Sequence, residues 1–211
     1  MALRHDRRVR GSTFASVLAA VFLPLGAGSV VANETDTIRQ YQFAESPGGS
    51  YELVMKEVPR PVAGDNDVLV RVRATSLNRR DLNQFRSEYS DEWTYAGGIP
   101  LSDGAGEVIA VGNNVTRFEV GDRVAGIFFE TWIDGAPSEE SLASDRGVNA
   151  GGMLSEVIVT NEAGLVSIPD HLSYEEAATL PCAAVTAWVG LFKRGRIEPE
   201  QYVLLQGTGG V

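Results

Sequence analysis

The chain has 211 residues and a formal net charge of −10, with 44% hydrophobic and 22% charged residues. This length and balance predict a packed core in one large domain or somewhat more. The acidic balance disfavours nucleic acid or an anionic membrane as a partner. The single cysteine, Cys182, excludes an intrachain disulfide. Together with only two histidines, it leaves too few ligands for a Cys-rich structural zinc site or a His-based catalytic one.

The N-terminal segment is typical of a secretory signal over residues 1–33. Residues 1–10 carry four arginines, residues 14–25 are mostly apolar, and a Val-x-Ala pair ends at residue 32. The alternative is a basic extension or a wrongly assigned start. The apolar stretch is shorter than the about 20 residues of a membrane span, so we expect no span. We expect export, periplasmic or secreted, if the signal is real and a cytoplasmic protein otherwise. The Arg7-Arg8 pair leaves twin-arginine export open.

The first half of the body predicts strands joined by turns. Residues 38–43 and 51–58 predict two strands, with the turn signal Ser-Pro-Gly-Gly between them. Residues 67–74, DVLVRVRA, predict the clearest strand. The valines of this strand share a buried face, and Leu69 falls on the wetter face with two arginines. Short strands and Gly/Pro turns over the first 170 residues favour a β-rich barrel or sandwich over alternating βαβ units.

Asn78 lies between the end of this strand and a short helix, which is predicted over residues 79–86 with Asn78 as its cap. Asn78 and Asp81 have two interpretations: a capped surface helix, or residues at the mouth of a site. Residues 91–95, DEWTY, predict a loop that either lines a pocket or covers the barrel end.

Further strands are predicted at residues 107–111 and 123–127, the second after a Gly121-Asp122 turn. An aromatic stretch follows, in which Phe129 and Trp132 are the side chains that we place nearest a substrate. The polar, acidic residues 134–149, with a short helix at 138–143, predict solvated surface more than a lid or pocket wall. Strands at 153–160 and 165–168 complete the first domain.

The remaining residues predict two helices and a final strand. Ser173 and Glu176 form a capping box, and Pro181 starts a helix from residue 182 to about 194. Cys182 is interpreted as a small buried residue rather than a reactive thiol. Residues 202–205, YVLL, predict a buried strand. It leads into the beginning of a dinucleotide-binding fingerprint or an ordinary Gly-rich turn, formed by Gly207, Thr208, Gly209, Gly210 and Val211.

Several motifs occur in one order: VLVRVRATSLNRRDL, PLSDGAGEV, FEVGDRV, a Gly-Gly pair before Ser-Glu-Val, LSYEEAATLPCAAVTAW and LLQGTGG. In this order they resemble the medium-chain dehydrogenase/reductase family, in its zinc-independent, quinone-oxidoreductase-like or alcohol-dehydrogenase-like branch. The resemblance implies a mainly β fold with some α: a GroES-like, partly open β-barrel over residues 34–170. Residues 171–211 would then hold the first helix and strand of a Rossmann α/β domain that is cut off.

The resemblance also implies how a metal site has changed. Zinc-using relatives place a cysteine near Asn78 and a His-Glu pair where Ser102-Asp103 stands. The replacements remove two metal ligands, so we expect no zinc.

The function implied by the resemblance is hydride transfer between NADP or NAD and a small carbonyl, quinone or enone. Asn78 is the candidate that orients the carboxamide or the acceptor oxygen. Relatives often carry a tyrosine where Arg79 stands. Tyr89 is therefore the substitute candidate for the proton donor, and a water molecule is the alternative. Thr186 would lie near the cofactor, unless it only bonds its own helix backbone. The cofactor-binding residues would therefore be Asn78, Thr186, Gly207, Thr208, Gly209, Gly210 and Val211.

A second hypothesis is a non-catalytic GroES-like binding or remnant module that cannot hold a dinucleotide. The 211-residue chain is expected to bind little or no NADPH. A full-length form is compatible with a homodimer.

Overall fold

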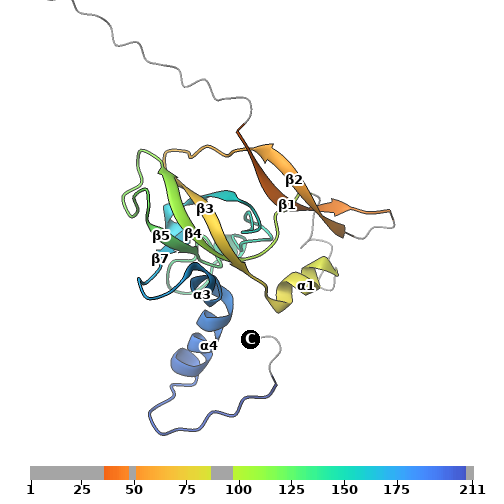
Figure 1. Ribbon diagram of the computed structural model, residues 1–211. Helices are drawn as coiled ribbons and strands as arrows, with labels where there is room; N and C mark the ends of the chain where they lie inside the picture. The colour runs from red at the N-terminus through yellow and green to blue at the C-terminus, as the bar shows by residue number, and fades with distance from the viewer. Residues whose placement is uncertain (1–35, 48–50, 87–96, 208–211) are drawn as a thin grey trace, which may run out of the picture. The chain divides into compact units, whose positions relative to one another are not determined.

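Seven strands carry the fold in the computed structural model, which describes residues 36–47, 51–86 and 97–207 (Figure 1). Five of them form an antiparallel sheet in the order β6-β3-β4-β5-β7, and β1 and β2 form a separate antiparallel pair. The larger sheet is open, because β6 and β7 are edge strands. The strands are β1 Thr37–Glu45, β2 Tyr51–Pro59, β3 Asp67–Ser76, β4 Asp103–Val111, β5 Arg123–Gly126, β6 Val157–Asn161 and β7 Leu165–Ser167.

The central strand β3 is the one that the sequence predicts most clearly, and its first half is buried on both faces. Val68 and Val70 belong to the main core cluster, as predicted. The expectation that Leu69 faces water is wrong: Leu69 is buried against Ile38 of β1 and Val157 of β6. The alternation could not reveal this, because the β1–β2 pair covers a face that a single sheet would leave wet.

The main core lies between the central strands and the segments that cross them. It contains Val68, Val70, Val108, Phe118, Val124, Met153, Ile158 and Leu165. The backbone passes close to another segment at Gly106 and Gly112, since a Cβ at Gly106 would collide with the carbonyl oxygen of Arg71 and one at Gly112 with that of Gly64. Glycine at these two positions therefore lets neighbouring backbone segments pass without a clash.

All seven strands differ from their predicted bounds, most of them by one or two residues, and β4 and β6 differ most. β4 starts at Asp103 rather than at residue 107, because Asp103 pairs with Ser76 at the end of β3. β5 ends at Gly126, one residue early. β6 starts at Val157, because the residues before it bond to other segments: Met153 N–H donates to the Leu101 carbonyl oxygen at 2.8 Å, and Glu156 N–H donates to the Arg39 carbonyl oxygen in β1 at 2.9 Å.

Short helices lie between the strands and after the last one. They are α1 Arg79–Phe85, α2 Glu139–Leu142, the 3₁₀ turn η2 Glu162–Gly164 and α3 Tyr174–Ala178. α1 begins after Asn78 and α3 after the Ser173–Glu176 capping box, so both predicted caps are confirmed. Ala177 and Ala178 of α3 are buried against Ala105 and Ala125 of the sheet, so α3 is fixed to the core.

A helical run from residue 180 to 194 follows α3, as predicted from Pro181. It consists of η3 Leu180–Ala184, α4 Val185–Trp188 and η4 Val189–Arg194, in which η3 and η4 have the wider π turns. Figure 1 shows the run leading away from the sheet. Its aromatic side chains remain exposed, and the rings of Trp188 and Phe192 stack with centroids 4.3 Å apart.

Residues 202–205 do not form the predicted strand. They have no strand assignment, and Leu204 is 83% exposed. A strand needs a neighbour to receive its backbone hydrogen bonds, and no described segment lies beside it. None of the helices in the described ranges is both long and apolar enough to cross a membrane.

Candidate functional site

Three elements meet at a cluster of polar side chains, which we name the junction cluster: Asn78, Asp81, Ser102, Asp103 and Cys182. The first two belong to the start of α1, the next two to the start of β4, and Cys182 to the first turn of η3. Strand register explains the meeting, because Asp103 pairs with Ser76, two residues before Asn78.

Asp103 holds the junction cluster together. Its carboxylate is fully buried, and each oxygen accepts one hydrogen bond. Ser102 Oγ donates to Oδ1 at 2.9 Å, and the Cys182 backbone N–H donates to Oδ2 at 3.0 Å. The second bond satisfies one of the backbone N–H groups that a helix start leaves without an intrahelical partner. Asp103 therefore fastens the helical run to the sheet.

Burial shifts the protonation of two members of the junction cluster. The pKa of Asp81 is raised, mainly by burial and to a smaller extent by Asp103, although the Asn78 N–H and Arg80 oppose the shift. The pKa of the Cys182 thiol is also raised, first by burial and then by the Asp103 charge, with Arg80 opposing. Cys182 is therefore a neutral thiol at neutral pH, and a poor nucleophile or metal ligand.

Asn78 carries a donor that the rest of the described chain leaves unused. Its backbone N–H donates to Asp81 Oδ2 at 2.6 Å, which fixes the residue at the start of α1. Its side-chain Nδ2 is buried, yet it donates to none of the described residues. A buried donor without a partner calls for an explanation. An acceptor oxygen on a ligand, such as a carboxamide or carbonyl oxygen, fits this donor.

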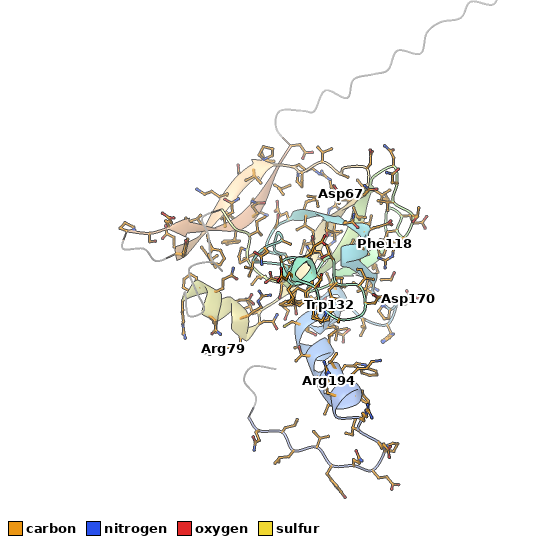
Figure 2. The ribbon with its side chains drawn as sticks, turned by 180° about the vertical axis from the view of Figure 1, so that it is seen from behind. Asp67, Arg79, Phe118, Trp132, Asp170 and Arg194 are labelled. Carbon is orange, nitrogen blue, oxygen red and sulfur yellow. The ribbon has the colours of Figure 1, made fainter. Side chains whose placement is uncertain are left out.

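The predicted aromatic pair lies in a neighbouring segment. Phe129 stacks on Trp132 with centroids 5.6 Å apart and meets Phe128 at 4.7 Å. Phe128 in turn lies under the guanidinium of Arg80 in α1, 4.4 Å from its ring centroid. Figure 2 labels Trp132 in this segment and Arg79 at the start of α1. The aromatic stack thus connects to the helix that Asn78 caps.

The other predicted site residues are not drawn into the junction cluster. Thr186 is exposed, and its hydroxyl donates to the Cys182 carbonyl oxygen at 2.7 Å, which is the local bond that the sequence left as an alternative. Gly207 is exposed, with φ +79°. Tyr89, Thr208, Gly209, Gly210 and Val211 lie outside the described residues.

Sequence reasoning missed Asp103 and Cys182 as partners, and it treated Cys182 as a small buried residue. The signal was the resemblance itself, which marks residues 102–103 as a former ligand pair. It also assigned residues 134–149 to solvated surface, which is wrong for Asp145 and Arg146, because both are buried. A charged pair inside a polar loop gives no pattern that separates it from surface.

Two shallow hollows lie beside the β1–β2 pair, lined in part by Gln40, Val58, Tyr41 and Met55. They share no residue with the junction cluster. Within the described ranges, no group of three or more His, Cys, Asp and Glu residues is arranged to hold a metal ion.

Comparison with known proteins supports the family assignment. Residues 64–170 match the alcohol dehydrogenase GroES-like domain. A zinc-type alcohol dehydrogenase-like protein of Schizosaccharomyces pombe is 43% identical over 157 residues, covering 74% of this chain and 45% of that protein.

Solved structures of the same family are also similar to this chain. A candidate alcohol dehydrogenase from Sinorhizobium meliloti 1021 is similar with a TM-score of 0.67 at 37% identity, covering 77% of this chain and 48% of the other. A quinone oxidoreductase from Pseudomonas syringae pv. Tomato DC3000 has a TM-score of 0.57 at 30% identity, over 77% and 43%.

The chain therefore carries an alcohol dehydrogenase GroES-like domain and belongs to the medium-chain dehydrogenase/reductase family. It spans about half the length of the curated relatives that it matches.

Proposed function

We propose that this chain is part of an NAD(P)-dependent oxidoreductase that acts on a small carbonyl, quinone or enone. A nicotinamide cofactor would supply or accept the hydride. The buried, unused Nδ2 donor of Asn78 carries the proposal, because it stands where the helical run joins the sheet and suits a carboxamide or carbonyl oxygen. Names of the relatives, among them alcohol dehydrogenases and quinone oxidoreductases, support the reaction class.

In this proposal the chain's own residues bind and orient. Asn78 Nδ2 holds the oxygen of the nicotinamide amide or of the acceptor, and Phe129 and Trp132 form an apolar wall that excludes water from a planar substrate. Tyr89 or a water molecule supplies the proton. Thr186 and the residues from Gly207 to Val211 would contact the cofactor.

The test uses the protein expressed from its natural gene, with NADPH or NADH and one acceptor of each class. The Asn78→Ala variant should lose about 10²-fold in kcat/KM, as loss of a positioned donor does in other enzymes. The control is Asn114→Ala, because Asn114 bonds Asn66 on an exposed turn and should leave the rate unchanged. Equal rates for both variants would contradict the role of Asn78.

We further propose that the activity needs no zinc, although the name of the S. pombe relative contains "zinc-type". The donors at the junction cluster do not fit this metal: Asn78 offers an amide, Ser102 a hydroxyl, and the Cys182 thiol is held neutral. Both Asp103 oxygens already accept hydrogen bonds. Metal analysis after growth with added zinc should find it far below stoichiometry, and one zinc per chain would contradict this proposal.

Domain limits and export are proposals of the same kind. The family match ends at residue 170, which supports a GroES-like domain over residues 34–170 and the start of a cofactor domain over 171–211. The mass of the mature natural protein tests the proposed signal over residues 1–33. A product that begins near Asn33 supports export, and one that begins at Met1 opposes it.

A second candidate function is a non-catalytic GroES-like binding module. The exposure of Tyr202, Leu204 and Leu205 favours this module, because these residues form no strand of a cofactor domain in the described chain. NADPH binding separates the two candidates. Micromolar binding and turnover by the natural protein support the oxidoreductase, while absence of both supports the module.

A further inference from the structure

The segment from residue 127 to 152 is fastened to the sheet by a buried arginine. Arg146 has a side chain only 1% exposed, and its guanidinium lies 2.7 Å from Glu130 Oε1 and donates to Thr160 Oγ1 at 3.0 Å. Thr160, in β6, also donates to Glu130 Oε1 at 2.7 Å. Burial lowers the pKa of Arg146 and Glu130 opposes the shift, and an arginine keeps its charge in proteins. The base of the segment is thereby fixed to the sheet.

The preceding residue, Asp145, faces the opposite way, toward α1. Its carboxylate accepts from Arg80 at 2.7 Å and from Asn149 Nδ2 at 2.6 Å. The Arg80 and Asp145 side chains are only 12% and 8% exposed. Removing one partner of a pair shielded to this degree costs more than breaking a surface ion pair, because it leaves a buried charge unpaired. A second bond between the same two parts runs from Gln84 Nε2 to the Gly147 carbonyl oxygen at 2.9 Å.

Arg80 also reaches the aromatic stack. Its guanidinium carbon lies 4.4 Å from the Phe128 ring centroid, the geometry of a cation–π contact. Phe128 packs on Phe129, and Phe129 on Trp132, whose Nε1 donates to the Gly135 carbonyl oxygen at 3.2 Å. One side chain of α1 therefore holds both the ionic and the aromatic contact to this segment.

We propose that Arg80 is a positioning residue that sets the place of the aromatic stack relative to Asn78. Arg80 lies two residues after Asn78 on the helix that Asn78 caps, and Asp145 and Phe128 receive its two contacts. This inference rests on the proposed function, in which the stack is the substrate wall and Asn78 the orienting donor. Loss of the Arg80 contacts would free the stack without unfolding the sheet, because Arg146 still fastens the segment to β6.

The test follows Trp132 alone. The chain has three tryptophans, so a Trp93→Phe, Trp188→Phe background leaves Trp132 as the reporter. In this background, Arg80→Gln and Asp145→Asn are compared with Arg117→Gln by acrylamide quenching, with thermal unfolding recorded for each. Arg117 is a matched control because it also lies over a phenylalanine, Phe118, at 5.1 Å and donates to a carbonyl oxygen.

Quenching of Trp132 should rise about twofold in Arg80→Gln and in Asp145→Asn, with no further rise in the double variant. Arg117→Gln should leave the quenching unchanged even if it lowers the midpoint of thermal unfolding, which separates positioning from general stability. Quenching in Arg80→Gln equal to that in Arg117→Gln overturns the proposal. If Arg80→Gln or Asp145→Asn fails to fold, the test uses Arg80→Lys instead. Lysine keeps the charge and loses the planar contact to Phe128, so quenching of Trp132 should again rise.

This readout needs neither cofactor nor substrate. A chain that shows the expected quenching but transfers no hydride refutes the proposed function alone. A chain that transfers hydride with Trp132 unmoved in Arg80→Gln refutes the positioning role alone.

Discussion

Two short apolar segments of similar composition differ in burial and in secondary structure in this molecule. Val68-Leu69-Val70 in β3 is buried on both faces, whereas Val203-Leu204-Leu205 is exposed and forms no strand. The difference lies in their neighbours: β3 pairs with β4 and β6 and is covered by β1, while the second segment has no partner in the described chain. Burial is thus a property of the assembly around a segment and not of its residues.

The largest expected effect compares two leucines, one from each region. Leu165 is fully buried in the main core and Leu204 is 83% exposed. Leu165→Ala should lower the free energy of unfolding by about 2–5 kcal/mol, since it leaves a cavity. Leu204→Ala should change it by less than about 0.5 kcal/mol. Urea unfolding of the 211-residue chain measures both, and a cost above 1 kcal/mol for Leu204→Ala would break the comparison.

Glycine substitutions should differ even in sign between the sheet and the helical run over residues 180–194. A Cβ at Gly106 would collide with the backbone of Arg71, whereas a Cβ at Gly190 in the helical run would meet nothing within 4 Å. Gly106→Ala should therefore destabilise by about 1–3 kcal/mol through overpacking. Gly190→Ala should stabilise the run by up to about 1 kcal/mol through helix propensity. Calorimetry of both variants tests this, and the opposite order would mean that the helical run packs against something at Gly190.

The helix cap at Ser173, between the sheet and the helical run, should have a smaller effect on the free energy of unfolding. Ser173 Oγ accepts from the Glu176 N–H at 3.1 Å and starts α3, whose alanines are buried in the sheet. Ser173→Ala should cost about 1 kcal/mol. Thr186→Ala, which removes only a local bond in the exposed run, is the control and should change little. Indistinguishable unfolding curves for Ser173→Ala and the parent chain would show that α3 does not depend on its cap.

The sequence was sufficient where a local pattern determines the structure. The strands β1 to β3, the cap at Asn78, the Ser173–Glu176 box and the helix after Pro181 all follow from alternation, capping and turn chemistry. It failed where distant partners decide. Leu69 is buried by another pair of strands, and Asp145 and Arg146 are buried by ion pairs that join residues far apart in the chain.

In the candidate site, too, local patterns could be read from the sequence and contacts between distant residues could not. Asn78 could be named from its place between a strand and a helix, and from the family resemblance. Asp103 and Cys182 could not be paired, because 79 positions separate them and only the folded chain brings the Cys182 N–H to the Asp103 carboxylate. The family motif marked the position of Asp103 but gave no indication of this bond.

The start of β4, the start of α1 and the helical run meet at the junction cluster, and the titration of Cys182 tests that meeting directly. As the only cysteine, it can be followed by the rate of iodoacetamide alkylation against pH. Burial and Asp103 raise its pKa, and Arg80 lowers it. Because the folded chain favours the neutral thiol, stability from this group holds at neutral pH and falls as the pH rises through the folded-state pKa.

We predict an alkylation midpoint above that of an ordinary thiol. The midpoint should fall in Asp103→Asn, which removes the nearby negative charge, and should rise in Arg80→Gln, which removes the positive one. Asp134→Asn, in the exposed part of the loop, should leave it unchanged. Shifts of opposite sign at Asp103 and Arg80 would establish that Cys182 lies between these charges, and an ordinary midpoint that neither substitution moves would contradict the junction cluster.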